Sequence, residues 1–303
     1  MKNIFLVNDD FEYSRLDRWF RKNVCEVPQS LIEKNIRKGN IKVNDRKERS
    51  SYKLKKGDEI IIKNISFIPN KHKKINIKYK ATSKDLSASS NLFVENNDNF
   101  VVINKPSGIA VQSGTKSRKN IIDILRSTEE FKNTQPFPVH RIDKETTGIL
   151  IVAKNRKYAQ LFTSLFRMRK IHKTYLGIVL GVPQQNKGTM KDELFYYEGK
   201  RKYKTLAITH FTVLDTNKNY SLLKLSPETG RKHQLRKQLL LHGFPILGDN
   251  KYRMFGKQSH MKNSLMLHSY KINFSIQNNK YIYSADIPLE FKKNLKEKYL
   301  KIF

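Results

Sequence analysis

The stretch VHRIDKETTGILIVAKN, residues 139–155, places a single aspartate, Asp143, before a Thr-Thr-Gly turn that leads into an apolar strand over residues 149–153. A carboxylate in a loop beside a rigid strand is well positioned to act as a preorganised reactive group. An aspartate between Arg141 and Lys144 is also a common surface ion-pair partner, and exposed pairs of that kind contribute little to stability. The stretch alone therefore leaves a catalytic and a surface role open for Asp143.

Around this turn, short apolar runs predict a large mixed domain over residues 91–303. Strands are expected at 100–103, 149–153, 175–180, 206–214, 220–225 and 281–287, and helices at 120–126, 158–169 and 233–241. The strands outnumber the helices, and they do not alternate regularly with them. This order favours an α+β fold around a mainly antiparallel mixed sheet over a doubly wound one.

Residues 12–63 predict a separate small module of two helices and short strands. Apolar residues recur at helical spacing over 14–24 and again over 28–39, where Gly39 can end the second helix. Alternating residues at 41–44 and the apolar run after Gly57 predict strands. The polar, basic segment 64–90 that follows is interpreted as a linker, with room for one edge strand at 75–79.

The overall composition indicates a polyanionic partner. The 303 residues include 60 Lys plus Arg against 27 Asp plus Glu, a net charge of +33. An excess of that size repels itself, and RNA or DNA phosphates are the usual compensating groups. A general drift of the composition towards lysine is the alternative reading. The single cysteine excludes an internal disulfide, and the short apolar runs predict a protein without a signal peptide or membrane span, in the cytoplasm.

Several common kinds of catalytic site are missing from the sequence. There is no GxxxxGK[ST] phosphate loop, no GxGxxG fingerprint after a strand and no GxSxG elbow. The eight histidines include no HExxH motif, and the carboxylates do not cluster as a two-metal nuclease would require. We therefore expect chemistry performed by side chains alone, with no metal and no nucleotide cofactor.

Two further stretches carry polar groups next to apolar elements. In SPETGRKHQLRKQLLLHGFPILGDNKY, residues 226–252, Arg236 falls on a predicted helix. An arginine there can pair bidentately with a buried carboxylate and keep it ionised, or it can contact phosphate. In IHKTYLGIVLG, residues 171–181, Tyr175 begins a predicted strand, a position at which tyrosine is more often structural than catalytic.

Taken together, four motifs resemble the pseudouridine synthases that modify large-subunit ribosomal RNA. They are HRIDKETTGILIVA, NLFVENNDNFVVINKPSGIAVQSG at 91–114, KTYLGIVLG, and TGRKHQLR followed by HGFPILGDNKY. The RLD of the first helix and IRKGNIKVN resemble an S4 RNA-binding domain. Ile142 and Thr147 replace the commoner Leu and Ser, and Lys237 and Gln238 stand where relatives usually have an aliphatic residue and a histidine.

The resemblance implies isomerisation of uridine to its C-glycoside, without a cofactor, in flipped-out uridines of large-subunit ribosomal RNA. It assigns the nucleophilic role to Asp143, either by attack on the sugar or by deprotonation at C2′. Arg236 is expected to pair with Asp143. Tyr175 is expected to stack on the target base and help remove its C5 proton, while Arg141 would fill the space left in the RNA.

The resemblance of the first module to S4 domains implies that its basic side chains contact RNA. These are Arg15, Arg18, Arg37, Lys38 and Lys42. A solvated helical face is the alternative for all five. For the whole chain, the alternatives are a non-catalytic RNA-binding ribosome assembly factor and an N-glycoside hydrolase that admits water and releases uracil. The family resemblance also implies a monomer.

Overall fold

The computed structural model describes residues 2–8, 11–25, 27–63, 81–82, 91–113, 119–198, 201–254 and 264–302. The chain forms two compact units, Met1–Lys78 and Tyr79–Phe303. The predicted linker at 64–90 lies outside the described residues apart from 81 and 82, and so does the edge strand considered at 75–79.

The first unit packs two helices, α1 (Leu16–Asn23) and α2 (Gln29–Lys38), with a three-stranded antiparallel sheet. The sheet has the order β1 (Lys2–Leu6), β3 (Glu59–Lys63), β2 (Ile41–Val43). Both helices were predicted, and Gly39 ends the second with a left-handed φ of 77°. The strand β1 was not predicted. The core of the unit consists of apolar side chains from the helices and strands, including Leu16, Trp19, Phe20, Ile32, Ile36, Ile41 and Ile60.

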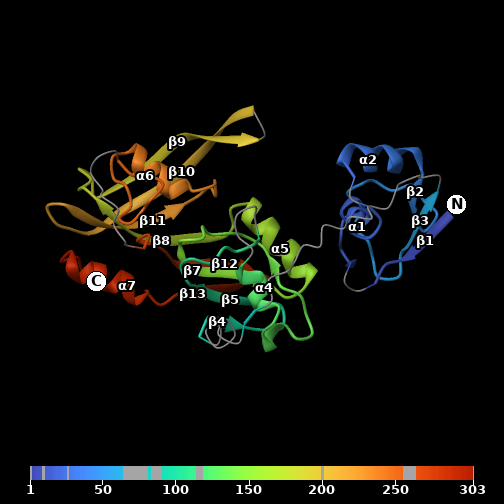
Figure 1. The fold of residues 1–303 in the computed structure, drawn as a ribbon, viewed down its shortest axis with the longest axis horizontal. Coiled ribbons are helices and arrows are strands. Elements are labelled where there is room, and N and C mark those ends of the chain that lie inside the picture. The colour runs from blue at the N-terminus through green and yellow to red at the C-terminus, as the bar shows by residue number, and fades with distance from the viewer. Residues whose placement is uncertain are drawn as a thin grey trace. The chain divides into compact units, whose positions relative to one another are not determined.

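A single ten-stranded sheet organises the described part of the second unit (Figure 1). Its strands are β4 (Phe93–Asn96), β5 (Phe100–Lys105), β6 (Phe137–Pro138), β7 (Thr147–Ala153), β8 (His172–Leu180), β9 (Lys187–Glu198), β10 (Arg201–Thr216), β11 (Tyr220–Pro227), β12 (Leu267–Ile276) and β13 (Asn279–Ser284). The main path runs β4-β5-β7-β12-β8-β11-β10-β9, with β13 beside β12 and β6 beside β7. Among the strand pairs that the structure describes, only β7–β12 is parallel. The α+β fold with a mainly antiparallel mixed sheet is therefore confirmed.

Apolar clusters cover both faces of this sheet where β5 and β7 pair. Val101 and Leu150 belong to one cluster, whereas their neighbours Phe100 and Ile149 belong to the other. Successive side chains of a strand point to opposite faces, so a strand covered on both faces must be apolar throughout. That requirement explains why these two strands were predictable as continuous apolar runs.

The helices of the second unit border the sheet, and three of them were predicted. They are α4 (Ile121–Leu125), α5 (Arg156–Arg167), α6 (Gln234–Leu241) and the unpredicted α7 (Leu289–Glu297), with a short 3-10 turn at Glu129–Phe131. Asn120 and Asn155 begin α4 and α5 by accepting a hydrogen bond from a backbone amide three residues later. The helix α6 follows β11 directly along the chain and therefore starts at one end of the sheet.

Candidate active site

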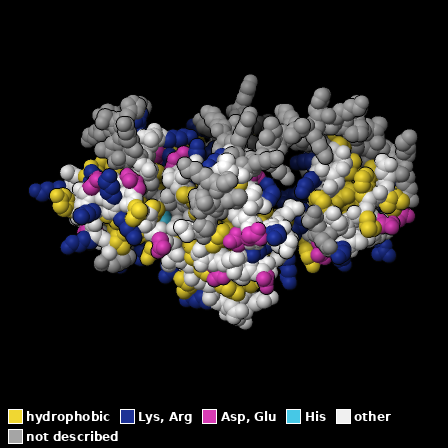
Figure 2. Space-filling view, turned by 60° about the horizontal axis from the view of Figure 1, so that its bottom comes forward, with side chains coloured by type: hydrophobic (Ala, Val, Ile, Leu, Met, Phe, Trp, Pro, Cys, Tyr) yellow, Lys and Arg dark blue, Asp and Glu magenta, His cyan; other side chains and the backbone are white. Residues whose placement is uncertain are grey.

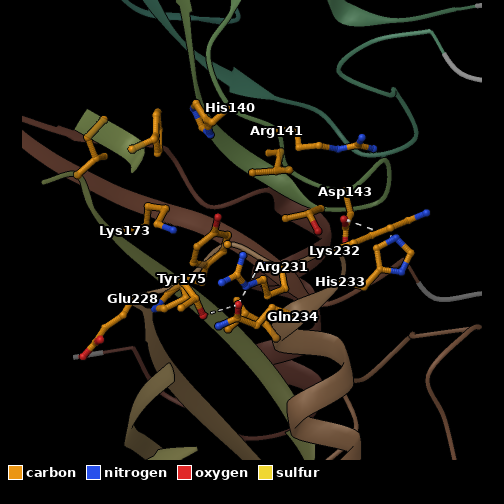
Figure 3. A pocket seen from close by; sticks show the side chains of 18 of the residues that line it. His140, Arg141, Asp143, Lys173, Tyr175, Glu228, Arg231, Lys232, His233 and Gln234 are labelled. Atoms are coloured by element: carbon orange, nitrogen blue, oxygen red, sulfur yellow. Dashed lines mark hydrogen bonds and ion pairs between the residues drawn. The ribbon is translucent and has the colours of Figure 1, made fainter. Parts of the chain in front are cut away.

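A cavity of about 610 Å³ opens in the second unit between four stretches of the chain. It is lined by the loop before β7, by the C-terminal end of α5, by the first half of β8, and by the segment from the end of β11 into α6. Asp143, Tyr175, Arg236 and Arg141 all line it, as Figure 3 shows for three of the four. The fold thus brings together the site residues that the sequence predicted in three separate motifs.

Two residues at the start of α6 flank the carboxylate of Asp143, whose side chain is 18% exposed. Arg236 Nη1 lies 3.4 Å from Oδ2, and His233 Nε2 lies 3.8 Å from Oδ1. His233 precedes the helix in a left-handed conformation, with φ at 55°, and its Nδ1 lies 2.9 Å from the hydroxyl of Tyr252. Burial lowers the pKa of His233 despite the nearby charge of Asp143. Arg236 is therefore the permanently charged neighbour of this carboxylate.

Arg236 has a second and closer carboxylate partner, Asp249, in addition to the expected Asp143. Its Nε lies 2.7 Å from Asp249 Oδ2 and its Nη2 lies 2.8 Å from Oδ1, while the Asp249 side chain is 0% exposed. This fork uses one edge of the planar guanidinium and leaves Nη1 for Asp143. Burial alone would lower the pKa of Arg236, but the bonds and charge of Asp249 outweigh it and raise that pKa.

Asp249 is itself held by the backbone that follows it. The amides of Lys251 and Tyr252 both donate to Oδ1 at 2.9 Å, and the Arg236 guanidinium carbon lies 5.1 Å from the centre of the Tyr252 ring. Sequence reasoning missed Asp249 and Tyr252, although both lie in the GDNKY motif. The presence of Asp249 in the same stretch as Arg236, residues 226–252, could have predicted an ion pair between them.

Tyr175 lies on β8 and is almost fully buried beside the cavity. The strand begins at His172, so Tyr175 is inside it and not at its start as predicted. Burial raises the pKa of Tyr175 to about 12; a hydrogen bond with Ser269 opposes that shift and the charge of Asp143 adds to it. At neutral pH the side chain is therefore a neutral phenol.

A buried lysine fixes the loop that carries Asp143. Lys105 is 0% exposed, and its Nζ donates to the carbonyl oxygens of Pro106 at 2.7 Å, Ile109 at 3.0 Å and Lys144 at 3.1 Å. Burial lowers the pKa of Lys105 to about 7, against the opposing charges of Glu145 and Asp143. The amide of Gly108 also donates to the Lys144 carbonyl, at 2.9 Å. The NKPSG motif thus positions the loop that carries Asp143, a role that the sequence did not reveal.

The unusual residues after Arg236 do not line the cavity. Gln238 is 0% exposed and lies in a buried amide network: it accepts from Thr209 Oγ1 at 2.7 Å and donates to Asp192 Oδ2 at 2.7 Å. Lys237 Nζ donates to the carbonyl of Phe195 at 2.9 Å. Both side chains therefore face the β9–β10 hairpin, and the departure from the usual residues leaves the cavity lining unchanged.

Three more polar side chains line the cavity and were not predicted. The Ile151 amide donates to His140 Nε2 at 2.8 Å, and burial lowers the pKa of that imidazole to about 3. Burial also lowers the pKa of Lys173 to about 8. Thr146 Oγ1 is buried, and no hydrogen-bond partner for it lies among the described residues. His140 and Lys173 lie towards the end of the cavity away from Asp143 (Figure 3).

Of the five basic side chains predicted to contact RNA in the first unit, two form ion pairs within the protein and three are exposed. Arg15 donates two hydrogen bonds to Asp17, at 3.0 and 2.6 Å, and Lys42 pairs with Asp45 at 3.0 Å. Arg18, Arg37 and Lys38 are exposed. An exposed lysine that was not predicted, Lys53, has its pKa lowered first by desolvation and then by the charges of Arg18 and Arg15. Figure 2 shows basic side chains spread over the visible face and interspersed with acidic ones.

The described residues contain neither a metal-binding cluster nor a membrane-spanning helix. No group of three or more histidine, cysteine, aspartate or glutamate side chains in that part of the chain could hold a metal ion. No helix within the same ranges is long and apolar enough to cross a membrane.

Comparison with known proteins identifies the family. A family model described as RNA pseudouridylate synthase matches residues 99–241. "Ribosomal large subunit pseudouridine synthase C" of Buchnera aphidicola subsp. Baizongia pistaciae is 33% identical over 300 residues, covering 94% of this chain and 93% of that protein. The protein of the same name from Rickettsia bellii is 32% identical over 303 residues, covering 92% and 94%.

A solved structure agrees with these sequence relatives. Human RNA Pseudouridylate Synthase Domain Containing 4 superimposes with a TM-score of 0.63 at 25% identity, covering 72% of this chain and 96% of that one. The site geometry, the family model and relatives that match nearly the whole length agree. The chain belongs to the ribosomal large-subunit pseudouridine synthase family.

Proposed function

We propose that this chain converts uridines of large-subunit ribosomal RNA into pseudouridine, with Asp143 as the reacting carboxylate. The observation that carries the proposal is the convergence of Asp143, Tyr175 and Arg236 on one cavity in a member of this family. In the reaction the N1–C1′ bond breaks, the base turns, a C5–C1′ bond forms and the C5 proton is lost as N1 gains one. Substrate and product are isomers, so the balance needs no water, oxidant or nucleotide.

Asp143 can serve either of two routes, attack on C1′ or removal of the C2′ proton. Each needs an ionised carboxylate in a partly desolvated site, and a fixed positive charge favours that form. Nη1 of Arg236 supplies the charge from 3.4 Å. Because Asp249 holds the other edge of the guanidinium, Arg236 is oriented before the RNA arrives, which lowers the reorganisation needed in the transition state.

Tyr175 supports the proposal as a stacking surface for the flipped base. Its buried phenol, with a pKa of about 12, is neutral in the free protein. Removal of the C5 proton by its oxygen would therefore have to be coupled to loss of the phenol's own proton. The neutral phenol offers an uncharged face to a uracil ring, while Lys and Arg side chains elsewhere in the lining favour the phosphates of the bound RNA.

The remaining assignments follow from the same proposal. The target uridine leaves its stack to enter the cavity, and Arg141, exposed at its edge, takes the place of the base in the RNA. Within the first unit, residues 12–63 act as an S4-like RNA-binding module, and residues 91–303 act as the catalytic domain. The chain acts as a monomer in the cytoplasm on large-subunit ribosomal RNA.

The test is pseudouridine mapping by carbodiimide primer extension on large-subunit ribosomal RNA transcripts, without added metal or nucleotide. Transcripts are incubated with the wild-type protein, Asp143→Asn or the matched control Glu145→Gln. We expect primer-extension stops at modified uridines with the wild type and Glu145→Gln and none with Asp143→Asn. All three proteins should bind RNA equally and unfold at similar temperatures. Glu145 is half-exposed and lies 3.7 Å from Arg236, so its replacement removes a nearby carboxylate without touching the reacting one.

Three other outcomes would contradict the proposal. Wild-type activity in Asp143→Asn would remove that residue from the reaction. Tight binding without stops, on naked transcripts and on pre-ribosomal particles, would favour the assembly factor. Release of free uracil would favour the N-glycoside hydrolase.

A further inference from the structure

The β9–β10 hairpin exposes aromatic side chains outside the cavity. Phe195 is 42% exposed and Tyr196 is 43% exposed, although their strand is otherwise anchored to the body of the unit. The register of the hairpin places Tyr203 opposite Tyr196 and Lys204 opposite Phe195. Figure 1 shows the hairpin as a long pair of strands beside α6. Large aromatic rings that stay exposed to solvent often mark a binding surface.

The exposed rings lie on the two faces of the hairpin, because neighbouring residues of a strand alternate. On one face, the rings of Tyr196 and Tyr203 stack with their centres 5.3 Å apart and an interplanar angle of 21°. On the other, Lys202 Nζ lies 3.8 Å from the centre of the Phe195 ring and Lys204 Nζ lies 5.7 Å from it. The hairpin therefore presents aromatic surface and positive charge together.

The stacked tyrosines lie on the face of β9 that meets α6. Asp192 reaches Gln238 of that helix, and Tyr196 is four residues further along the strand, on the same side. The hairpin is also tied to the cavity lining, since Arg231 Nε donates to the Leu206 carbonyl at 3.1 Å. These contacts fix the rings relative to the helix that carries His233 and Arg236.

Positive charge continues from the cavity towards this face. Lys232 lines the cavity, and Lys237 contacts the Phe195 carbonyl on the hairpin. The pKa of Lys237 is lowered first by burial and then by the charges of Lys251 and Lys232. A chain of phosphates leaving the cavity would meet favourable charge along α6 up to the tyrosines.

We infer that the Tyr196–Tyr203 pair is a stacking platform for an unpaired nucleobase of the bound RNA, separate from the base in the cavity. The inference rests on the proposed RNA substrate. Stacking on aromatic rings tolerates any base, and basic side chains beside the rings hold the phosphates, which is how proteins bind single-stranded nucleic acid. A cross-strand tyrosine pair also stabilises its hairpin. That role does not require the Tyr196 ring to stay 43% exposed close to the ammonium group of Lys237, which binds the adjoining Phe195 carbonyl.

The test compares Tyr196→Thr with Tyr196→Phe in the full chain. Threonine keeps strand propensity and removes the ring, whereas phenylalanine keeps the ring. The matched control is Tyr299→Leu, which removes a tyrosine that is 88% exposed in the C-terminal segment. We measure the Kd for a large-subunit ribosomal RNA transcript, its salt dependence and the thermal midpoint. Loss of one stacked base is expected to weaken binding roughly 5- to 150-fold in Tyr196→Thr, with Tyr196→Phe and the control close to wild type.

Salt dependence and cross-linking separate stacking from charge and from folding. The salt slope of Tyr196→Thr should match the wild type because no charge is removed, whereas Lys237→Gln, which removes a charge next to the platform, should lower it by about 0.7–0.9. Transcripts carrying 5-iodouridine should cross-link under ultraviolet light to the hairpin peptide of the wild-type protein. KM should rise in Tyr196→Thr while kcat at saturating RNA stays unchanged.

The outcomes distinguish this inference from the proposed function. Wild-type affinity and no hairpin cross-link, in a protein that makes pseudouridine, would overturn the platform and leave the function standing. A loss of RNA binding in Tyr196→Thr, together with no isomerisation by the wild type, would overturn the proposed function and leave the platform standing. Weaker binding of Tyr196→Thr to ribosomal particles but not to the transcript would overturn the platform, because it would assign the rings to a protein contact.

Discussion

Gly148 and Ser269 lie backbone against backbone where β7 meets β12. A Cβ on Gly148 would lie 2.8 Å from both the nitrogen and the carbonyl carbon of Ser269 and closer still to its oxygen, and the φ of Gly148 is 103°. Ser269 is the register neighbour of Tyr175 on β8, and it hydrogen-bonds that side chain. The glycine of the Thr-Thr-Gly turn therefore sets the separation between the loop of Asp143 and the strand of Tyr175.

Gly148→Ala should be strongly destabilising because it combines a left-handed backbone with a clash against main-chain atoms. We expect a loss on the order of 3–4 kcal/mol in the free energy of unfolding, measured with denaturant. The control is Gly108→Ala, whose φ is 83° with open space around the added carbon. It should lose only about 1–2 kcal/mol from backbone strain. Equal losses in the two variants would mean that the strands can separate at no cost.

Asp249→Asn should lower kcat much more than it changes RNA affinity, because it loosens Arg236 and not the RNA-binding surface. Breaking a buried ion pair from one side should also cost about 3–5 kcal/mol of stability. The separate variant Arg236→Lys should also have a low kcat, although it keeps the positive charge, because an ammonium cannot form the two-bond fork with Asp249. Glu193→Gln, which breaks an exposed pair with Lys204 at 2.8 Å, is the control and should cost less than about 1 kcal/mol. Full activity in Asp249→Asn would show that Arg236 needs no orienting partner.

His140 should make the protein less stable in acid. Its pKa is about 3 in the folded protein and 6.5 when unperturbed, so the unfolded state binds more protons between those values. The free energy of unfolding should therefore fall as pH falls from 6.5 towards 3, and the contribution of His140 is fully present above 6.5. His140→Gln can still accept from the Ile151 amide but does not titrate, so its stability profile should be flatter over that range. Identical profiles for the two proteins would contradict this role of His140.

Charge on the first unit should appear in the salt dependence of RNA binding. The double variant Arg18→Gln/Lys53→Gln should lower the slope of log affinity against log salt by about 1.4–1.8, the value for two lost phosphate contacts. Lys292→Gln/Lys293→Gln removes the same charge from exposed positions on α7 and should leave the slope near that of the wild type. If the two double variants behave alike, the first unit contributes only net charge, and its S4-like role is not supported.

Uniform burial made one central strand easy to predict, whereas buried polar residues concealed another. The strand at Thr147–Ala153 is buried on both faces and shows as an unbroken apolar run. The central strand β12 was missed because its first half contains the buried polar residues His268 and Ser269. Those side chains are partnered by Thr147 and Tyr175, residues distant in sequence, and without their partners they read as surface positions.

The same reasoning applies to the site. The motifs identified Asp143, Tyr175 and Arg236, and the fold brings them to one cavity. The contacts between motifs were not predictable, because Arg236 reaches Asp249 through a turn of the chain and Lys105 reaches Lys144 across the sheet. Pairings of this kind depend on tertiary geometry, which a single sequence does not contain.

Lys105 holds the loop of Asp143 entirely through main-chain oxygens, those of Pro106, Ile109 and Lys144. Every amino acid carries a carbonyl oxygen, so this anchor places no demand on the side chains at the three positions it binds. Ile109 and Lys144 can therefore change during evolution, provided that their backbone path is kept. Lys105 itself cannot, because no shorter side chain brings its nitrogen to this buried point, where the protonated amine donates to all three oxygens. The most variable and the least variable positions of the loop are thus expected to lie in direct contact.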